Sequence, residues 1–279
     1  MVKLSIIIKV EIKAITLDIK SERYDKFLKN NNHLKIKTFK AIIGKNLSEE
    51  EIIAENLATK DLLYDERFFS YGAIGCAASH KAIWKNSIEE NKNILVLEDD
   101  CCTNPKIEEF IENNINILND CDICFFGINT NSVLQIKNPQ GLQFSSIGFN
   151  PAYPTSEWIK NAFNQTNIKN IIFNKLIIGF GTWCYFITPL GAKKLTELIF
   201  PLSLKEIKIP LINNGQSRIM GLISIDRSGC AIYKKINALI TYPFLAYNQN
   251  NNISTTDHNQ EFNILFRDNL KIKKTNYND

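Results

Sequence analysis

The chain has 279 residues, of which 44% are apolar and 22% are charged. This composition is ordinary for a folded globular protein and the length suits one large domain, which excludes a disordered chain. The net charge of +4, from 33 basic and 29 acidic residues, is too mild and too evenly spread for a nucleic-acid-binding surface, so no nucleic acid partner is expected.

The cysteine spacing and the terminal segments indicate the cellular compartment of the protein. Seven cysteines lack the regular spacing of a secreted disulfide framework, and no signal-peptide pattern opens the sequence. No apolar run reaches the roughly 18–20 residues that span a bilayer. We therefore expect a cytoplasmic protein, whose only membrane contact would be peripheral, at the inner face of the cytoplasmic membrane. The basic residues Lys271, Lys273 and Lys274 could make that contact, although a solvated tail is the simpler interpretation.

The N-terminal region alternates between strand-like and helix-like patterns. Apolar runs at residues 4–8 and 12–17 predict strands, and the polar stretch 18–23 that follows them predicts the start of a helix. A further apolar run at 39–43, closed by Gly44, predicts another strand. This alternation is typical of an α/β domain.

Two helices are predicted from their capping and periodicity. Ser48, with Glu51 three positions later, has the form of a capping box for a helix over 49–57. Between residues 72 and 91 the apolar positions recur at steps of three, seven and four, which places them on one helical face. These positions are Ile74, Ala77, Trp84 and Ile88. This second helix has the clearest pattern in the chain.

Three further strands are predicted from continuous apolar runs. Residues 94–97 have the pattern of a strand that is covered on both faces, and similar runs occupy 123–126 and 183–187. Thr188 and Pro189 after the last run suit the N-cap and first turn of a helix. That helix is expected to point three apolar residues inward: Ala192, Leu195 and Leu198.

Residues 129–175 differ in composition from the rest of the chain. They are rich in Asn, Gln, Ser, Pro and aromatic residues and show no sustained period, so we expect long loops or a small lobe there. Long loops over a rigid sheet often carry recognition. A mobile tail is expected over 256–279, which leaves a single domain at 1–255.

The acidic run Glu98-Asp99-Asp100 directly follows the strand predicted at 94–97. Three consecutive carboxylates repel one another and lose hydration at the end of a buried strand, and a divalent cation would offset that cost. Since side chains alternate along a strand, Glu98 and Asp100 would share a face and are the candidate metal ligands, while Asp99 would point the other way. A solvated acidic turn, or an N-cap for the following segment, is the alternative interpretation.

Residues 71–84 read Tyr-Gly-Ala-Ile-Gly-Cys-Ala-Ala-Ser-His-Lys-Ala-Ile-Trp, and a Leu-Glu-Asp-Asp strand end follows at 97–100. This combination resembles glycosyltransferase family 25, which includes bacterial lipooligosaccharide galactosyltransferases and collagen galactosyltransferases. Weaker similarity extends over roughly residues 12–255. The resemblance implies a GT-A type fold, in which a Rossmann-like α/β sheet flanked by helices binds a nucleotide sugar. The irregular, loop-rich insertion at 129–175 would then lie on the acceptor side.

The same resemblance implies an activity. It is the metal-dependent, inverting transfer of a hexose, galactose from UDP-galactose, onto a sugar of a bacterial lipooligosaccharide or lipopolysaccharide. The acidic run would hold Mn²⁺ or Mg²⁺ beside the leaving nucleoside diphosphate, and Asp226 is the candidate base for the acceptor hydroxyl. Contacts to the UDP-hexose donor are implied for Leu17, Asp18, Arg23, Gly44, Gly75, Ser79, His80, Asp99, Gly181 and Thr182.

Two alternative functions remain open at this point. The same acids could serve metal-dependent phosphoryl transfer or phosphodiester hydrolysis. A non-catalytic nucleotide-sugar-binding protein with the same fold is the other alternative. The commonest nucleotide-hydrolase, metalloprotease and serine-hydrolase motifs are absent from the sequence. The Gly-Phe-Gly segment ending at Gly181 precedes a predicted strand rather than a helix, which excludes a dehydrogenase.

Several further side chains have structural as well as functional interpretations. His80 lies on the flank of the apolar helix face, where a buried structural histidine is as reasonable as a nucleotide ligand. The neighbouring Ser79 would point away from that face, so the two are not expected to contact one ligand. Cys121 and Cys124 have a Cys-x-x-Cys spacing, but without a second pair they are expected to be buried thiols rather than zinc ligands.

Overall fold

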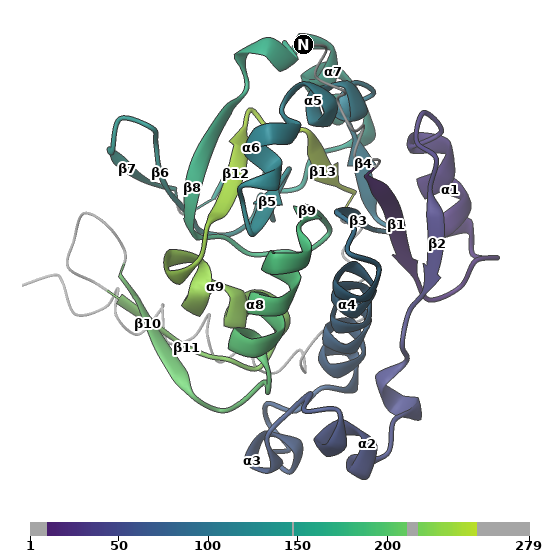
Figure 1. The fold of residues 1–279 in the computed structure, drawn as a ribbon, viewed down its shortest axis with the longest axis vertical. Helices are drawn as coiled ribbons and strands as arrows, with labels where there is room; N and C mark the ends of the chain where they lie inside the picture. The colour runs from purple at the N-terminus through teal and green to yellow at the C-terminus, as the bar shows by residue number, and fades with distance from the viewer. Residues whose placement is uncertain (1–9, 147, 211–216, 250–279) are drawn as a thin grey trace, which may run out of the picture.

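A computed structural model of the chain describes residues 10–146, 148–210 and 217–249. Within these ranges the centre is a nine-stranded sheet in the order β2-β1-β3-β9-β5-β12-β8-β6-β7 (Figure 1). Its strands are β1 (Glu11–Thr16), β2 (Lys37–Lys40), β3 (Ile94–Glu98), β5 (Ile123–Phe125), β6 (Leu134–Lys137), β7 (Gln143–Ser146), β8 (Ile172–Ile178), β9 (Cys184–Ile187) and β12 (Ala238–Tyr242). The strand predicted at 4–8 and the tail predicted at 256–279 lie outside the described residues.

Helices connect and cover these strands. The helices are α1 (Glu22–Asn30), α2 (Glu49–Ala54), α3 (Lys60–Leu63), α4 (Tyr71–Glu90), α5 (Ile107–Asn113), α6 (Ile115–Asn119), α7 (Ser156–Gln165), α8 (Pro189–Ile199) and α9 (Ile225–Ile232), with single 3-10 turns η1 (Gly44–Asn46), η2 (Ile168–Asn170) and η3 (Tyr233–Lys235). Two small antiparallel pairs join β4 (Cys101–Thr103) to β13 (Ala246–Asn248), and β10 (Glu206–Pro210) to β11 (Ser217–Gly221). No helix in the described part of the chain is both long and apolar enough to cross a membrane.

The sheet is mixed in direction. β1 pairs in parallel with both β2 and β3, and β5 pairs in parallel with β12. Between these two groups lies β9, which is antiparallel to β3 and to β5. The five strands β1, β2, β3, β5 and β12 therefore run in the same direction and end at the same edge of the sheet. Ligands of open α/β sheets bind at that edge.

Both faces of the sheet are covered, as the apolar run at 94–97 predicted. Ile94 and Val96 belong to a core that includes residues of α4, α8 and α9, whereas Leu95 and Leu97 belong to a second core with α1, α5 and α6. Successive side chains of a strand point to opposite faces, so a strand buried on both sides needs an uninterrupted apolar sequence. The expected α/β class, a Rossmann-like sheet flanked by helices, is confirmed.

The predicted helix starts agree closely with the structure. Ser48 and Glu51 form the expected capping box at α2, since each side chain bonds the backbone N–H of the other residue. Thr188 caps α8, where its hydroxyl accepts a hydrogen bond from the N–H of Gly191. Such caps satisfy N–H groups that have no partner inside the helix. Local hydrogen bonding therefore sets these boundaries.

Two residues expected in the core are exposed. Ile88, in the last turn of α4, is 39% exposed, and Leu198 of α8 is 46% exposed. In α8 the inward position after Leu195 is taken by Ile199, which is 5% exposed. The spacing of four residues, rather than three, returns the side chain to the face that packs on the sheet.

The segment 129–175 contains more regular structure than its composition indicated. It holds β6, β7, α7, η2 and the first part of β8, and its strands extend the central sheet by a hairpin at one end (Figure 1). β7 is the edge strand, and its four residues are exposed or half-buried. Because β7 is exposed or half-buried at every position, neither of its faces requires a repeating pattern of apolar side chains. The sequence of this strand therefore resembles that of a loop.

A close backbone contact joins η1 to the first half of α4. A methyl group added to Gly75 would lie 2.6 Å from the carbonyl oxygen of Ile42, and one added to Gly44 would lie 1.9 Å from that of Tyr71. Ser79 ties the two segments together, because its hydroxyl accepts from the N–H of Ile42 at 2.8 Å and donates to the carbonyl of Gly75 at 2.7 Å. Only glycine permits backbones to approach this closely.

This contact predicts that Gly75→Ala destabilises the protein. Alanine normally stabilises the interior of a helix by about 0.5–1 kcal/mol relative to glycine, but here the clash with backbone atoms should cost about 1–3 kcal/mol. Urea unfolding would measure the change. Gly148→Ala is the matched control, because its added methyl group would meet nothing closer than 3.9 Å. Equal stability of the two variants would contradict the prediction.

Candidate active site

A cleft of about 390 Å³ lies at the carboxyl ends of β1, β2 and β3. One wall is formed by the chain that leaves β1, and a second by η1 and the residues before it. The third wall is formed by the first half of α4 and the end of β3. The residues that line it include Thr16, Leu17, Asp18, Ser21, Arg23, Ile43, Gly44, Tyr71, Gly72, Gly75, Cys76, Ser79, His80, Glu98 and Asp99.

Most of the residues predicted to contact the donor meet in this cleft. Leu17, Asp18, Arg23, Gly44, Gly75, Ser79, His80 and Asp99 line it together with the predicted metal ligand Glu98. The predicted residues Gly181, Thr182, Asp100 and Asp226 are not on its walls. Ser79 and His80 both border this space but point to different neighbours, in agreement with the helix geometry: Ser79 bonds Ile42 and Gly75 on the η1 side, whereas His80 points toward Glu98. Both are covered because α4 is buried against η1 as well as against the sheet.

Asp99 is held by the β1 side of the cleft. Its carboxylate accepts from the Thr16 hydroxyl at 2.7 Å and from Arg23 Nε at 2.6 Å. Arg23 Nη2 also lies 3.4 Å from Asp100 Oδ2. Because Arg23 is partly exposed, the ion pairs contribute less to stability than to orienting the carboxylates. Asp99 therefore lies toward α1. Strand alternation does not decide this, because β3 ends at Glu98 and Asp99 and Asp100 belong to the turn that follows, where Arg23 pairs with both.

Glu98 points toward α4. Its Oε1 accepts from Thr182 Oγ1 at 3.0 Å and lies 3.3 Å from His80 Nε2. Burial on its own raises the pKa of the Glu98 carboxyl, but the His80 and Thr182 contacts, together with the charge of Arg23, outweigh it and lower the pKa below its usual value. Glu98 is therefore ionised at neutral pH.

A chain of hydrogen bonds behind Glu98 sets the orientation of His80. Trp84 Nε1 donates to the Tyr185 hydroxyl at 2.9 Å, and that hydroxyl lies 2.8 Å from His80 Nδ1. With its oxygen accepting from Trp84, Tyr185 satisfies its own O–H by donating to Nδ1, which leaves Nε2 to carry the ring N–H that faces Glu98. All three side chains are buried. Sequence periodicity located Trp84 in the core, but nothing in the sequence linked it to His80 through Tyr185.

Asp100 is compensated less completely, because Arg23 pairs with only one of its two carboxylate oxygens. Its Oδ1 is buried and makes no hydrogen bond within the described residues. Burial and the negative charge of Glu98 raise the pKa of the Asp100 carboxyl to about 7. A carboxylate in this position is stabilised by a cation, and hard divalent ions take carboxylate oxygens as ligands. The orphaned oxygen of Asp100 and the ionised Glu98 beside it therefore fit a Mg²⁺ or Mn²⁺ site.

Asp226 lies in the first turn of α9. Its Oδ1 accepts from the Ser224 hydroxyl at 2.6 Å and from the N–H of Arg227 at 2.8 Å. Burial, and then the negative charges of Glu98, Asp226 and Asp100, raise the pKa of the Cys76 thiol well above its usual value. All three carboxylates are thus close enough to act on the Cys76 thiol, and of the three only Glu98 lines the cleft.

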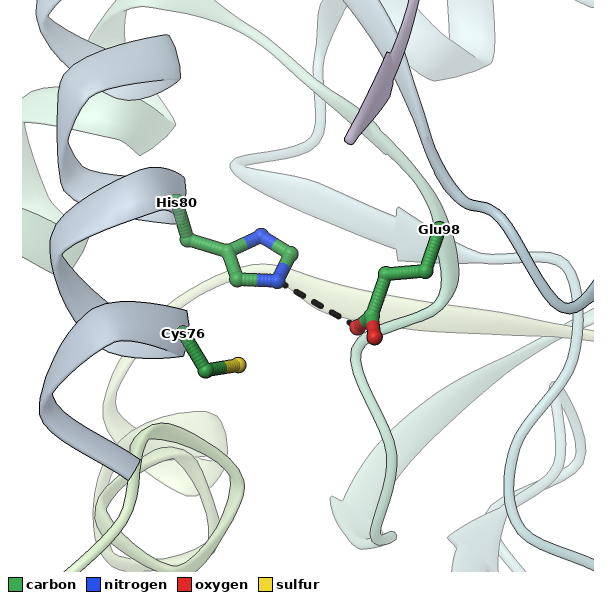
Figure 2. Close-up of side chains that lie close together, drawn as sticks. All are labelled: Cys76, His80 and Glu98. Atoms are coloured by element: carbon green, nitrogen blue, oxygen red, sulfur yellow. Dashed lines mark hydrogen bonds and ion pairs between the residues drawn. The ribbon is translucent and has the colours of Figure 1, made fainter. Parts of the chain in front are cut away.

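Cys76 is a site residue that the sequence interpretation did not select. Its Sγ, His80 Nε2 and a Glu98 carboxylate oxygen all lie within 4.8 Å of one another, and Figure 2 shows the first two projecting from successive turns of α4 toward Glu98. The spacing of four residues between Cys76 and His80 was the signal that could have found the pair. Cys121 and Cys124, by contrast, are buried free thiols, as expected.

Gly181 shapes the backbone before Thr182 and does not line the cleft. Its φ of +95° lies in the left-handed region, and a methyl group there would meet the Asn129 side chain at 2.4 Å. Asn129 Oδ1 accepts from Trp183 Nε1 at 3.0 Å. Glycine at this position therefore shapes the turn that delivers Thr182 to Glu98.

Comparison with known proteins gives consistent results. The family model described as glycosyltransferase family 25 (LPS biosynthesis protein) matches residues 11–209. Procollagen galactosyltransferase 2 of Homo sapiens is 27% identical over 143 residues, which cover 47% of this chain and 22% of that protein. The Mus musculus protein of the same name is 32% identical over 99 residues, covering 32% of this chain and 15% of its own length. The chain therefore matches less than a quarter of the length of these curated relatives.

The hydrogen-bond chain predicts that Tyr185→Phe is destabilising. Removing the hydroxyl leaves Trp84 Nε1 and His80 Nδ1 buried without their partner, at a cost of about 1–3 kcal/mol. Thermal and urea unfolding would measure it, with the exposed Tyr242→Phe as control. The double variant Trp84→Phe/Tyr185→Phe should lose less than the sum of the two single changes. Strict additivity would show that the two side chains do not act together.

Proposed function

Because the chain belongs to glycosyltransferase family 25, we propose that it transfers galactose from UDP-galactose to a sugar of a bacterial lipooligosaccharide or lipopolysaccharide, with inversion at the anomeric carbon. The observation that carries this proposal is the cleft at the carboxyl ends of three parallel strands, bordered by an ionised Glu98 and the Asp99–Arg23 pair. An amphiphilic acceptor would bring the protein to the inner face of the cytoplasmic membrane as a peripheral protein.

The cleft has the chemistry of a nucleotide-sugar site. Leu17 and Ile43 line it and are 45% and 40% exposed, so they offer apolar surface to a planar uracil ring. Tyr71 and Gly72 belong to the first turn of α4, where backbone N–H groups and the helix dipole favour negative charge. Arg23 supplies a full positive charge on the opposite wall. We place the diphosphate of the donor between these two positive features.

We assign to the acidic run the role of binding the metal ion that stabilises the departing UDP. Glu98 and Asp100 would hold Mn²⁺ or Mg²⁺, which when bound would neutralise the charge that develops on the departing UDP. Asp99 accepts from Thr16 and Arg23 and so keeps that side of the cleft in place. His80 and Thr182 fix the direction of Glu98. A rigid set of ligands of this kind requires little rearrangement when the donor binds.

Asp226 is assigned as the general base. Ser224 and the N–H of Arg227 both bond Oδ1, and we assign to Oδ2 the role of accepting the proton of the acceptor hydroxyl. The deprotonated oxygen then attacks the anomeric carbon as the bond to UDP breaks. The proximity of Asp226 to the Cys76 region supports this assignment, since Cys76 borders the cleft.

We predict that activity depends on Asp100 and on a divalent ion. Release of UDP from UDP-galactose in the presence of Mn²⁺ and an acceptor glycan should fall at least about 100-fold in Asp100→Asn, or after chelation, because the leaving group loses its neutralising charge. Glu89→Gln, which changes an exposed carboxylate at the far end of α4, is the control. Full turnover with chelator present would refute the metal role. UDP-galactose cleavage that is equally fast without acceptor would indicate hydrolysis rather than transfer.

For Asp226→Asn we expect a loss in kcat of about 10²–10⁴-fold, the range for removal of a general base, with little change in donor binding. Single-turnover transfer and calorimetric titration with UDP-galactose would separate the two quantities. Asp61→Asn, a change at an exposed acid of α3, serves as the control. A parallel loss of donor affinity would instead place Asp226 in the donor site.

A further inference from the structure

The Cys76, His80 and Glu98 side chains form a donor set that the proposed transfer reaction does not use as a unit. Their ligand atoms, Sγ, Nε2 and a carboxylate oxygen, lie within 4.8 Å of one another at the wall of the cleft (Figure 2). Thiolate and imidazole ligands favour Zn²⁺ over Mg²⁺ or Mn²⁺, which prefer oxygen. We propose that this triad is a Zn²⁺ site whose occupancy removes Glu98 from the donor-side metal and so inhibits the enzyme.

The geometry is close to that of a zinc site. Two ligands at about 2.0–2.1 Å from a tetrahedral zinc ion lie about 3.3–3.4 Å apart, and His80 Nε2 is 3.3 Å from Glu98 Oε1. Cys76 precedes His80 by one helical turn, so both side chains project from the same face of α4. Only the sulfur and the carboxylate need to adjust for all three to reach one ion.

The surroundings also suit a cation. Glu98, Asp100 and Asp226 each place negative charge near the Cys76 sulfur. Zinc-bound histidine almost always donates its other N–H to an oxygen, and the Tyr185 hydroxyl lies 2.8 Å from His80 Nδ1. When Nε2 binds zinc, the imidazole proton moves to Nδ1, and the Tyr185 hydroxyl, which donates to Nδ1 in the metal-free protein, must rotate so that its oxygen accepts from Nδ1 instead. The thiol proton of Cys76 is released to solvent.

The triad leaves one coordination position open toward the cleft. Three protein ligands and a tetrahedral preference leave a fourth place for water or a donor phosphate oxygen. Because Glu98 belongs to both sets, zinc and the hard cation proposed at Glu98 and Asp100 compete for it. The inhibitory consequence rests on the proposed transferase activity, whereas zinc binding itself does not.

Metal binding is tested on the metal-stripped full chain by titration with Co²⁺, a spectroscopic substitute for Zn²⁺. A thiolate charge-transfer absorption should appear and should be abolished by added Zn²⁺. In Cys76→Ser the absorption should be lost, and Zn²⁺ affinity measured by calorimetry should fall at least about tenfold. Cys121→Ser is the matched control, because serine can keep the bond that Cys121 Sγ donates to the Leu118 carbonyl. Thermal unfolding verifies that both variants are folded.

Inhibition is tested separately in the transfer assay at fixed Mn²⁺. The Zn²⁺ concentration for half-inhibition should rise at least about tenfold in Cys76→Ser and stay unchanged in Cys121→Ser. A wild-type chain without a thiolate–Co²⁺ absorption, or an absorption that survives in Cys76→Ser, overturns the site. If the wild-type chain shows the absorption but Zn²⁺ inhibits Cys76→Ser and Cys121→Ser equally, the regulatory role is overturned. If no acceptor is ever glycosylated but the absorption is present, the proposed function fails while the zinc site stands.

Discussion

A carboxylate at the end of a strand buried on both faces is the constraint on which the rest of this site depends. β3 is an interior strand of the sheet, and its last residue, Glu98, is half-buried and must keep a negative charge with reduced access to water. Two neighbouring elements provide the compensation. α4 supplies His80, and the segment before β9 supplies Thr182. The chain Trp84–Tyr185–His80 extends this compensation into the core, so the fold and the charge stabilise each other.

The second constraint is the close approach of η1 to α4. The glycines at 44 and 75 remove the side chains that would separate the two backbones, and Ser79 replaces them with hydrogen bonds. Three residues that the family resemblance associates with donor binding therefore determine the shape of the cleft. Gly44, Gly75 and Ser79 bring the first turn of α4 to the cleft wall.

The acidic run divides into three positions with different surroundings. Glu98 is held from α4, Asp99 is held from β1 and α1, and the half-buried Asp100 has one buried oxygen, Oδ1, that lacks a partner among the described residues. Consecutive carboxylates can differ in this way because β3 ends at Glu98, and the turn formed by Asp99 and Asp100 directs their side chains away from the strand geometry. One short run can therefore do two things: Asp99 holds the cleft wall together, and Glu98 and Asp100 remain available to a cation.

The sequence alone determined the elements whose signals are local. The strands at 94–97, 123–126 and 183–187, the caps at Ser48 and Thr188 and the α/β class followed from apolar runs and hydrogen-bonding residues. Tertiary structure decided what depends on partners far away in the chain: which side of α8 faces the sheet, the edge hairpin of β6 and β7, and the meeting of His80 with Tyr185. It also placed Cys76 beside Glu98. Periodicity reports that a side chain is covered but not by which element, since that depends on how strands and helices distant in sequence pack together.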